Sequence, residues 1–246
     1  MKQGKEKMKA PGKKAVFLAY AAMLLFPLLS CAWRQQAAGA AVLPAEGTVE
    51  DAREDAGEDA GDVRKIALTF DDGPHPHWTP RLLDGLRERD VQATFFLIGM
   101  YAAQYPQIVE RMDREGHLIG NHTYHHVRLD QGDVKEMRRE IRDTDQAIYL
   151  ITGKHTDYVR PPFGVWNEEL GEEMEVLPIL WTIDPLDWTT QDVGGIVEKV
   201  VTQAQDGAMI LLHDCYGSSV EAALEIVDIL KEQGFSFVTA EELVRP

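Results

Sequence analysis

Cysteines and basic side chains are both scarce in this sequence. Its 246 residues include two cysteines, Cys31 and Cys215. Because Cys31 lies in a segment that we expect to be removed, lipidated or embedded in a membrane, the two cysteines cannot form a disulfide framework. The 25 lysines and arginines are outnumbered by 41 aspartates and glutamates, which gives a net charge of −16. Because nucleic-acid binding requires basic side chains that neutralise phosphates, this balance predicts no nucleic-acid partner.

One long apolar run stands near the N-terminus, at residues 15–29, and six lysines precede it (Lys2, Lys5, Lys7, Lys9, Lys13, Lys14). This order is typical of a secretory signal. The sequence Leu28-Leu29-Ser30-Cys31 resembles a lipobox, with an unmodified cysteine as the alternative, and Ala38-Gly39-Ala40 resembles an ordinary cleavage site. If neither is cut, residues 15–33 are just long enough to anchor the chain in a bilayer. Each alternative predicts that the rest of the chain acts outside the cytoplasmic membrane.

Residues 45–62 are acidic and contain no aromatic side chain. The segment repeats Glu54-Asp55-Ala56-Gly57 as Glu58-Asp59-Ala60-Gly61. Like charges without hydrophobic groups predict a solvated, extended tether. We therefore predict a signal peptide or a membrane or lipoprotein anchor at residues 1–33 and an acidic flexible linker at 34–62. A single larger domain is expected to follow at 63–246.

Strand-like and helix-like segments alternate from residue 63 onward. Strands are predicted at 65–70, 93–98, 117–120, 158–160, 178–183, 208–213 and 235–238. The clearest helical spacing is that of Val134, Met137, Ile141, Ile148 and Ile151, and then of Val220, Leu224, Val227 and Leu230. Such alternation predicts an α/β fold with parallel strands. Because a full eight-fold barrel typically takes about 250 residues, we predict a distorted, incomplete (β/α) barrel.

Unusual polar residues follow five of the predicted strands. They are Asp71 and Asp72, residues 122–126, Arg160, residues 184–188, and His213 with Asp214. By itself, Asp71-Asp72-Gly73-Pro74 would be an ordinary turn, because Asp, Gly and Pro all favour turns. However, the carboxyl ends of parallel strands lie on one face, where α/β proteins build their sites. Polar groups at five such ends therefore predict one active site.

The spacing of His122 and His126 suits metal binding, because residues four apart share a face if the segment is helical. With a carboxylate from Asp72, they offer two nitrogen ligands and one oxygen ligand. This set suits a catalytic zinc, and it also suits non-haem iron. His125 is a rival ligand that we expect to point outward. A metal held in this way would lower the pKa of bound water towards ~7.

Asp71 is placed to accept a proton beside that metal. Neighbouring residues on a strand point in opposite directions, so Asp71 and Asp72 need not share a task. The nearby cation that tunes the basicity of Asp71 would be Arg160, whose alternative role is a surface ion pair. Prolines stiffen Arg160-Pro161-Pro162-Phe163-Gly164, so this loop can aim a backbone N–H at an oxyanion.

His213 ends an apolar strand and is a candidate general acid. Asp187 is the expected acidic partner that raises its pKa. The alternative for His213 is a core histidine bound to a backbone carbonyl. Trp188 and Leu211 offer an apolar wall for a small group such as a methyl, or they belong to the core.

Five motifs occur in order over nearly all of residues 63–246. They are Thr69-Phe70-Asp71-Asp72-Gly73-Pro74, His122-Thr123-x-x-His126, Arg160-Pro161-Pro162-Phe163, Asp184-x-x-Asp187-Trp188 and Leu211-Leu212-His213-Asp214. This set resembles the motifs of the polysaccharide deacetylases, the NodB-homology or carbohydrate esterase 4 family. The resemblance does not cover residues 1–62.

The resemblance implies a divalent metal held by Asp72, His122 and His126. Zinc is the usual metal, with Co²⁺, Ni²⁺ or Mn²⁺ as alternatives. The resemblance also implies that Asp71 acts as the base and that Arg160 orients it.

The remaining implied roles concern the acid and the acetyl group. His213 would be the acid, tuned by Asp187, while Trp188 and Leu211 resemble residues that line an acetate pocket. The backbone N–H of Phe163 resembles the oxyanion donor, and since that contact is through the main chain, phenylalanine should serve where many relatives have tyrosine.

The implied reaction is hydrolysis of N-acetyl groups on an aminosugar polymer by a monomeric catalytic domain. An exported, membrane-tethered enzyme meets peptidoglycan first, so its N-acetylglucosamine is the leading substrate. The motifs do not separate this substrate from chitin oligomers, O-acetylated xylan or N-acetylmuramic acid. Two other classes remain as alternatives: a tethered glycan-binding module and a non-haem iron oxygenase.

Overall fold

The structure is a computed structural model that describes residues 63–171 and 174–245. The predicted signal or anchor (1–33) and the predicted acidic linker (34–62) lie outside the described residues. Among the helices of the described part, none combines the length and the apolar character needed to cross a bilayer. The described residues fall within the range 63–246, and the domain boundary at residue 63 stays a prediction.

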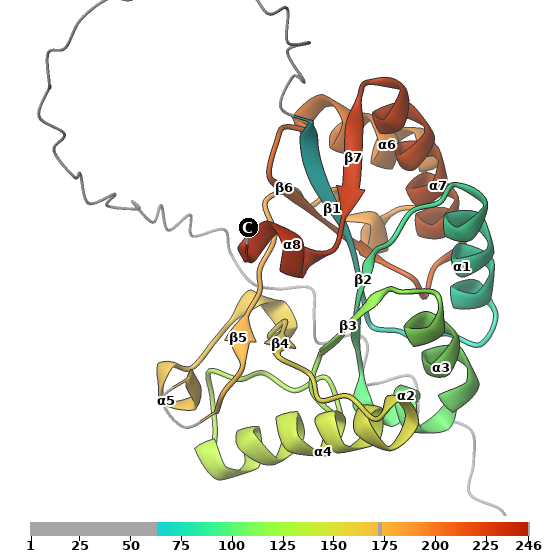
Figure 1. Cartoon of the computed structure of the whole chain (residues 1–246). Coiled ribbons are helices and arrows are strands. Elements are labelled where there is room, and N and C mark those ends of the chain that lie inside the picture. Colours follow the sequence, from blue (N-terminus) through green and yellow to red (C-terminus); the bar gives the residue numbers. More distant parts are fainter. Residues whose placement is uncertain (1–62, 172–173, 246) are drawn as a thin grey trace, which may run out of the picture. The chain divides into compact units, whose positions relative to one another are not determined.

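Seven parallel strands of the described chain form one sheet (Figure 1). In chain order they are β1 (Arg64–Asp71), β2 (Thr94–Leu97), β3 (Leu118–Asn121), β4 (Tyr158–Val159), β5 (Leu177–Pro178), β6 (Ala208–His213) and β7 (Phe235–Val238). Their spatial order is β5-β4-β3-β2-β1-β6, and β7 pairs with the first half of β1. The apolar runs of β1, β2 and β6 are buried along nearly their whole length, as expected for parallel strands covered on both faces.

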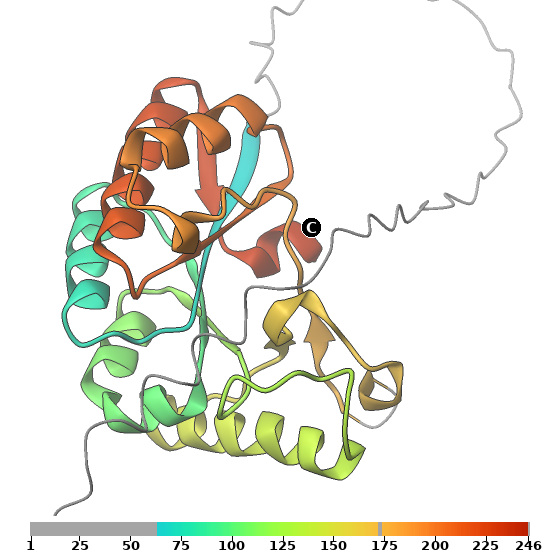
Figure 2. The same ribbon diagram turned by 180° about the vertical axis from the view of Figure 1, so that it is seen from behind.

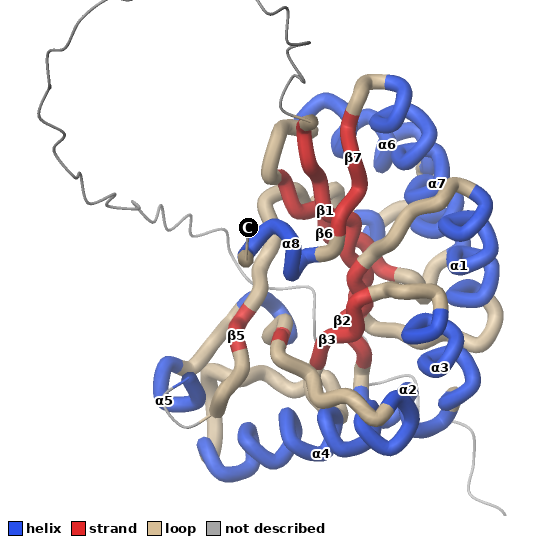
Figure 3. The backbone as a smooth tube through the Cα atoms, viewed as in Figure 1, coloured by secondary structure: helices blue, strands red, loops and turns tan. Residues whose placement is uncertain are grey.

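The predicted strand at 178–183 is wrong over most of its length. Only the residues of β5 pair with β4, and Ile183 then makes an isolated parallel bridge to Ile210 of β6. The segment passes from one end of the sheet to the other, so it cannot pair continuously with either neighbour. In Figure 3 the chain around β4 and β5 is mostly loop. This partial closure confirms the predicted distorted, incomplete (β/α) barrel.

Eight α-helices of the described chain connect or follow these strands. They are α1 (Trp78–Glu88), α2 (Gly99–Gln104), α3 (Pro106–Arg114), α4 (Val134–Thr152), α5 (Glu168–Gly171), α6 (Val193–Gln203), α7 (Gly217–Glu232) and α8 (Ala240–Val244). Figures 1 and 2 show α1, α3, α6 and α7 along one face of the sheet. Their apolar residues, among them Leu82, Val109, Ile196 and Ile226, are buried in one core with Ile210 of β6. Burial of these side chains is the main stabilising term of such a layer.

The two amphipathic helices expected from the sequence are present as α4 and α7. Of the predicted α4 positions, Met137, Ile141 and Ile148 are buried. The Asp133 side chain accepts a hydrogen bond from the backbone N–H of Lys135, which caps the start of α4. Helix α4 therefore begins and ends where its local sequence signals place it, and the same 3-4 spacing buries one face of α7.

Strand register decides which side chains meet at the carboxyl edge of the sheet. Asp71, the last residue of β1, lies opposite His213, the last residue of β6, and opposite Phe96 of β2. At the next pairs along the sheet, Asn121 of β3 lies opposite Val159 of β4. The segments that follow β1, β3, β4 and β6 therefore leave the sheet at the same edge, and they carry the candidate site.

Candidate active site

Three potential metal ligands converge after β1 and β3. Asp72 Oδ1 lies 3.5 Å from His122 Nε2 and 3.4 Å from His126 Nε2. One ligand atom from each of these residues lies within 4.8 Å of the other two. His125, the rival ligand, is exposed, and its Nδ1 lies 2.8 Å from Glu140 Oε1. The structure thus brings together Asp72, His122 and His126 and leaves His125 outside.

The expectation that His122 and His126 share a helical face is wrong. Residues 122–126 form a loop, and Thr123 and His126 adopt left-handed backbone with φ of 64° and 57°. The hydroxyl of Thr123 accepts a hydrogen bond from the backbone N–H of Val127 at 3.1 Å. The loop reverses within four residues and brings the two imidazole rings to 5.0 Å between centroids. The loop therefore brings the rings together without the helical spacing that we expected.

The protonation of His122 fits a metal ligand. Its Nδ1 lies 2.7 Å from the carbonyl oxygen of Arg160. A carbonyl only accepts, so Nδ1 carries the proton, and in the neutral ring Nε2 presents a lone pair towards Asp72. Burial lowers the pKa of His122 to about 3, which keeps the ring neutral at physiological pH.

The donor set of Asp72, His122 and His126 meets the requirements of a divalent cation. Asp72 Oδ1 is buried, and no hydrogen-bond partner satisfies it. It faces the Nε2 atoms of both histidines, and the lone pair of His122 Nε2 repels this oxygen unless a cation or a proton lies between them. Ligands 2.0–2.2 Å from a tetrahedral zinc are separated by about 3.3–3.6 Å. The two separations from Asp72 Oδ1, 3.5 and 3.4 Å, agree with this spacing, so the residues fit the metal.

Asp71 also lies near His122, and it is buried against Arg160. Its Oδ1 accepts a hydrogen bond from Arg160 Nη1 at 2.9 Å, and its Oδ2 lies 3.7 Å from His122 Nε2. Burial raises the pKa of Asp71 above its ordinary value, while the charges of Arg160 and His213 act in the opposite direction. A carboxylate with a raised pKa is a stronger base, which is the property needed beside a metal.

Arg160 is fully buried, so the alternative of a surface ion pair is wrong. Its remaining N–H groups donate to the carbonyl oxygens of Ile179 and Leu180, and its guanidinium lies 4.1 Å from the centroid of the Phe96 ring. These contacts allow it no freedom to move away from Asp71. Both carbonyls belong to the irregular segment that follows β5.

His213 and Asp187 form a second buried pair. Both oxygens of Asp187 engage His213: Oδ1 lies 2.8 Å from the ring Nδ1, and Oδ2 accepts the backbone N–H at 2.8 Å. Burial acts to lower the pKa of His213, but the hydrogen bond to Asp187 and the nearby carboxylates outweigh it and raise the pKa to about 9. With Nδ1 bound to Asp187, a protonated ring has Nε2 free to donate.

The three residues predicted to line the substrate, Leu211, Phe163 and Trp188, come from three different elements. Leu211 is buried in β6, two residues before His213 and thus on the same face of the strand. Phe163, in the 3-10 turn η2 (Pro162–Gly164), has an exposed ring that contacts the His126 ring edge-on at 4.9 Å. Trp188, in the 3-10 turn η3 (Asp187–Thr189), is 54% exposed and follows directly after Asp187.

Strained backbone gathers in the same region. The six non-glycine residues of the described chain with positive φ are Asp72, Asp90, Thr123, His126, Phe163 and Leu186. All but Asp90 belong to or adjoin the predicted site residues. Such conformations cost roughly 1–3 kcal/mol each and persist where surrounding contacts hold them, which is common at functional sites.

Sequence reasoning missed two positioning residues. The hydroxyl of Thr69 accepts from Arg160 at 2.6 Å and donates to the carbonyl of Ile210 at 2.6 Å, so it links the buried arginine to β6. Asp214 is fully buried and accepts a hydrogen bond from Thr79 at 2.5 Å. The period of two along β1 could have indicated Thr69, because it shares a face with Asp71.

Gly73 gives a first testable prediction. A methyl group at Gly73 would lie 2.4 Å from Asp214 Oδ1. We therefore expect Gly73→Ala to lower the free energy of unfolding by about 1–3 kcal/mol, as overpacking does. Gly194→Ala, where the nearest atom would be 3.7 Å away, is the matched control. Denaturant melts of both variants are the measurement, and equal stabilities would contradict the prediction.

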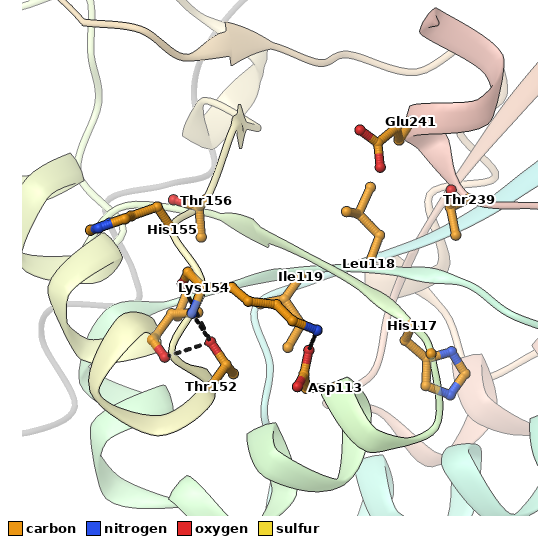
Figure 4. A pocket seen from close by; sticks show the side chains of 12 residues that line it. Asp113, His117, Leu118, Ile119, Thr152, Lys154, His155, Thr156, Thr239 and Glu241 are labelled. Carbon is orange, nitrogen blue, oxygen red and sulfur yellow. Dashed lines mark hydrogen bonds and ion pairs between the residues drawn. The ribbon is translucent and has the colours of Figure 1, made fainter. Parts of the chain in front are cut away.

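Two cavities of the described chain differ in their distance from the candidate site. One of about 300 Å³ opens at the amino end of β3, where Figure 4 shows Asp113 paired with Lys154. None of the predicted site residues lines it. The other, of about 550 Å³, is lined by Trp188, which follows Asp187, and by Tyr216, close to His213. The second cavity therefore adjoins the candidate site, and the first lies away from it.

A candidate metal site at the carboxyl edge of a parallel sheet places the domain among α/β proteins built for metal-assisted chemistry. A family model described as polysaccharide deacetylase matches residues 58–179. The solved structure of peptidoglycan deacetylase PdaC from Bacillus subtilis is similar, with a TM-score of 0.73 and 42% identity over 74% of this chain and 91% of that chain. The chain belongs to the polysaccharide deacetylase family.

Three named relatives carry different substrate names. The peptidoglycan-N-acetylmuramic acid deacetylase PdaC of Bacillus subtilis is 41% identical over 82% of this chain and 41% of its own length. The peptidoglycan-N-acetylglucosamine deacetylase PgdA of Listeria monocytogenes is 38% identical over 73% of this chain and 39% of its own length. A chitooligosaccharide deacetylase of Rhizobium leguminosarum bv. trifolii is 38% identical over 71% of this chain and 89% of its own length. The chain thus spans about two fifths of the length of PdaC and PgdA.

Proposed function

We propose that this chain is a metal-dependent deacetylase that hydrolyses N-acetyl groups on an aminosugar polymer, with N-acetylglucosamine of peptidoglycan as the leading substrate. The observation that carries the proposal is that candidate metal ligands, a candidate base and a candidate acid lie close together at one edge of the sheet. The ligand atoms of Asp72, His122 and His126 converge, and Asp71 Oδ2 lies 3.7 Å from one of these ligands. His213, opposite Asp71 in the register, supplies a proton donor.

A divalent cation, zinc in our proposal, would be held by Asp72, His122 and His126. When bound, it would lower the pKa of a water molecule and polarise the carbonyl of the acetamide. Asp71 accepts the proton of the attacking water. Arg160 keeps the carboxylate of Asp71 turned towards the ligands through the hydrogen bond at 2.9 Å. The backbone N–H of Phe163 donates to the developing oxyanion in this proposal.

The leaving group requires an acid, because an amide nitrogen leaves as an amine only when it is protonated. His213 donates this proton from Nε2, and Asp187 holds the ring by its Nδ1 and stabilises the imidazolium. Leu211 and Trp188 are proposed to contact the methyl of the acetyl group. The products are acetate and a glucosamine unit.

The names of the relatives support the substrate class and the place of action. Two act on peptidoglycan and one on chitooligosaccharides, so an acetylated hexosamine in a glycan is what their names share. We propose that residues 1–33 export or anchor the chain, that residues 34–62 act as a tether, and that the domain acts as a monomer outside the cytoplasmic membrane. Cell fractionation and size-exclusion chromatography of the full chain would test these points.

Acetate release by the purified full chain tests the activity. Zinc-loaded protein would be incubated with N-acetylglucosamine oligomers, peptidoglycan and acetylated xylan. We expect acetate from the first two and a loss of activity with a chelator. Metal binding without acetate from any substrate would overturn the proposal in favour of a glycan-binding module. Release from acetylated xylan alone would make the protein an O-acetyl esterase.

The pair formed by His213 and Asp187 predicts a pH effect. Because the carboxylate raises the pKa of His213 to about 9, the acid stays protonated through neutral pH and is lost as the pH rises past that value. Asp187→Asn removes the charge and lowers the pKa. The alkaline limb of kcat/KM should therefore move to lower pH, with activity at pH 8 reduced roughly 10- to 100-fold. A bound cation affects wild type and Asp187→Asn alike, so the alkaline limb of Asp187→Asn still lies at lower pH than that of wild type.

Asp184→Asn is the matched control for this measurement. Asp184 stands on the same loop, and its side chain accepts from the backbone N–H of Leu186 at 2.9 Å. It should leave the pH profile unchanged. Superimposable profiles for wild type and Asp187→Asn would show that Asp187 does not tune the acid.

A further inference from the structure

The cavity of about 550 Å³ beside His213 has the surface chemistry of a carbohydrate site. We call it the aromatic groove and define it by Trp78, Trp188, Thr190, Tyr216 and Glu221, which line it with neighbouring residues. Its size falls in the range of about 300–1,000 Å³ that is usual for ligand sites, and it combines aromatic faces with a few polar groups, as such sites do. Trp188 and Tyr216 are 54% and 42% exposed, so part of each side chain faces solvent.

We propose that the aromatic groove is a subsite for the hexosamine unit next to the one that is deacetylated, and that Trp78 is the residue specific to it. This inference rests on the proposed function. It extends the site to a second sugar ring, and of the motif residues only Trp188 lines the groove that would hold this ring.

The position of the groove follows from the proposed reaction. His213 protonates the nitrogen that remains on the sugar, so the sugar lies on the His213 side of the ligands and the acetyl group lies towards them. The groove begins at this side: Trp188 follows Asp187, and the ring of Tyr216 lies edge-on to His213 at 6.4 Å between centroids. The unit joined to the reacting sugar therefore meets the groove first.

Trp78 is fixed in place by two helices. It is the first residue of α1, and its ring packs on Gly217, the first residue of α7. A methyl group at Gly217 would lie 2.7 Å from that ring. Figures 1 and 2 show α1 and α7 side by side, so both helix starts bring their residues to the same edge of the sheet. A rigid, half-buried ring offers contact area at little entropic cost.

The charges of the groove select the ligand class. Of the described residues that line it, Glu221 alone is charged, and Thr190 and Gln191 are neutral hydrogen-bonding groups. Arg81 lies over the Trp78 ring, 5.0 Å from its centroid, but it does not line the groove, so an anion would find no cation among the lining residues. The hydroxyl groups of a sugar can donate hydrogen bonds to the side-chain oxygens of Glu221, Thr190 and Gln191. The C–H bonds of a pyranose ring pack favourably on the electron-rich face of an aromatic ring. An uncharged aminosugar ring therefore fits.

The test compares binding and turnover of chitotetraose by zinc-loaded protein. Trp78→Ala should raise KM, and weaken the binding of chitotetraose to the inactive Asp71→Asn protein, by roughly 3- to 10-fold, the scale of one aromatic contact. Because Trp78 does not touch the reacting atoms, kcat should stay within about twofold. Trp78→Phe should retain most of the affinity. Tyr149→Ala removes an exposed ring on α4 and should change nothing.

Each outcome decides a separate point. Unchanged KM and binding in Trp78→Ala would overturn the inference, as would an equal loss in Trp78→Ala and Tyr149→Ala. A fall in kcat without a change in KM would assign Trp78 to the chemistry and also overturn it. If chitotetraose binding depends on Trp78 but the protein releases no acetate, the groove is a sugar subsite and the proposed activity is wrong. If acetate release does not depend on Trp78, the proposed activity stands and the inference about the groove is wrong.

Discussion

Replacing Asp71 with Asn is expected to lower acetate release roughly 10²- to 10⁴-fold, the usual contribution of a general base. The amide is nearly isosteric and its oxygen can still accept from Arg160, but it cannot take a proton. The loss should appear in kcat, because Asp71 is not among the ligand atoms that converge on the candidate metal site. Steady-state kinetics on chitotetraose with zinc-loaded protein is the measurement.

Stability and metal content must be followed in the same experiment. Arg160 is fully buried, and leaving a buried charge without its partner can cost roughly 3–5 kcal/mol. Activity should therefore be measured well below the melting temperature of Asp71→Asn, with bound zinc determined in each sample. Asp113→Asn, which breaks an ion pair at the opposite end of β3, is the control. A folded, zinc-loaded Asp71→Asn protein within tenfold of wild type would remove Asp71 from the role of base.

Loss of the metal site should abolish activity altogether. We expect a chelator to remove acetate release and zinc to restore it. Substitution of a ligand should weaken zinc binding by more than the roughly 10- to 100-fold that loss of a residue supporting a ligand costs. His126→Gln is the informative variant, because the His126 side chain is partly exposed and its loss leaves no buried gap. Calorimetric titration of zinc into apo protein measures the change.

The neighbouring histidine provides a matched control for the metal. His125 lies one residue away, is exposed, and pairs with Glu140 at 2.8 Å. His125→Gln should bind zinc as wild type does and keep full activity. If His125→Gln loses zinc and His126→Gln keeps it, the ligand set is wrong even though the protein binds metal.

Much of the fold could be read from local sequence patterns. Six of the seven predicted strands agree with the structure to within one residue at each end, because each is a short apolar run bounded by turn residues. The exception, 178–183, pairs with β4 and β6 in turn. That path depends on where the two ends of the sheet lie, and no local pattern encodes it.

The candidate site was predictable in residue type but not in geometry. The helical spacing suggested for His122 and His126 is wrong, since left-handed residues in a loop bring the rings together. The left-handed residues are Thr123 and His126, and the loop that contains them is also held from outside, by the carbonyl of Arg160 that binds its first residue, His122. Similarly, Arg160 carried no sign of complete burial, because its partners come from four other segments of the chain.

The sequence by itself determined the order of strands and helices, the placing of polar residues at strand ends, and the family of the chain. Those features are written in short-range periodicity and in side-chain chemistry. Only the tertiary structure decided that the ligand atoms of Asp72, His122 and His126 meet, that Asp71 is buried against Arg160, and that Trp78 and Tyr216 line one groove. These juxtapositions depend on strand register and helix packing, which sum many weak contacts between residues far apart in the chain.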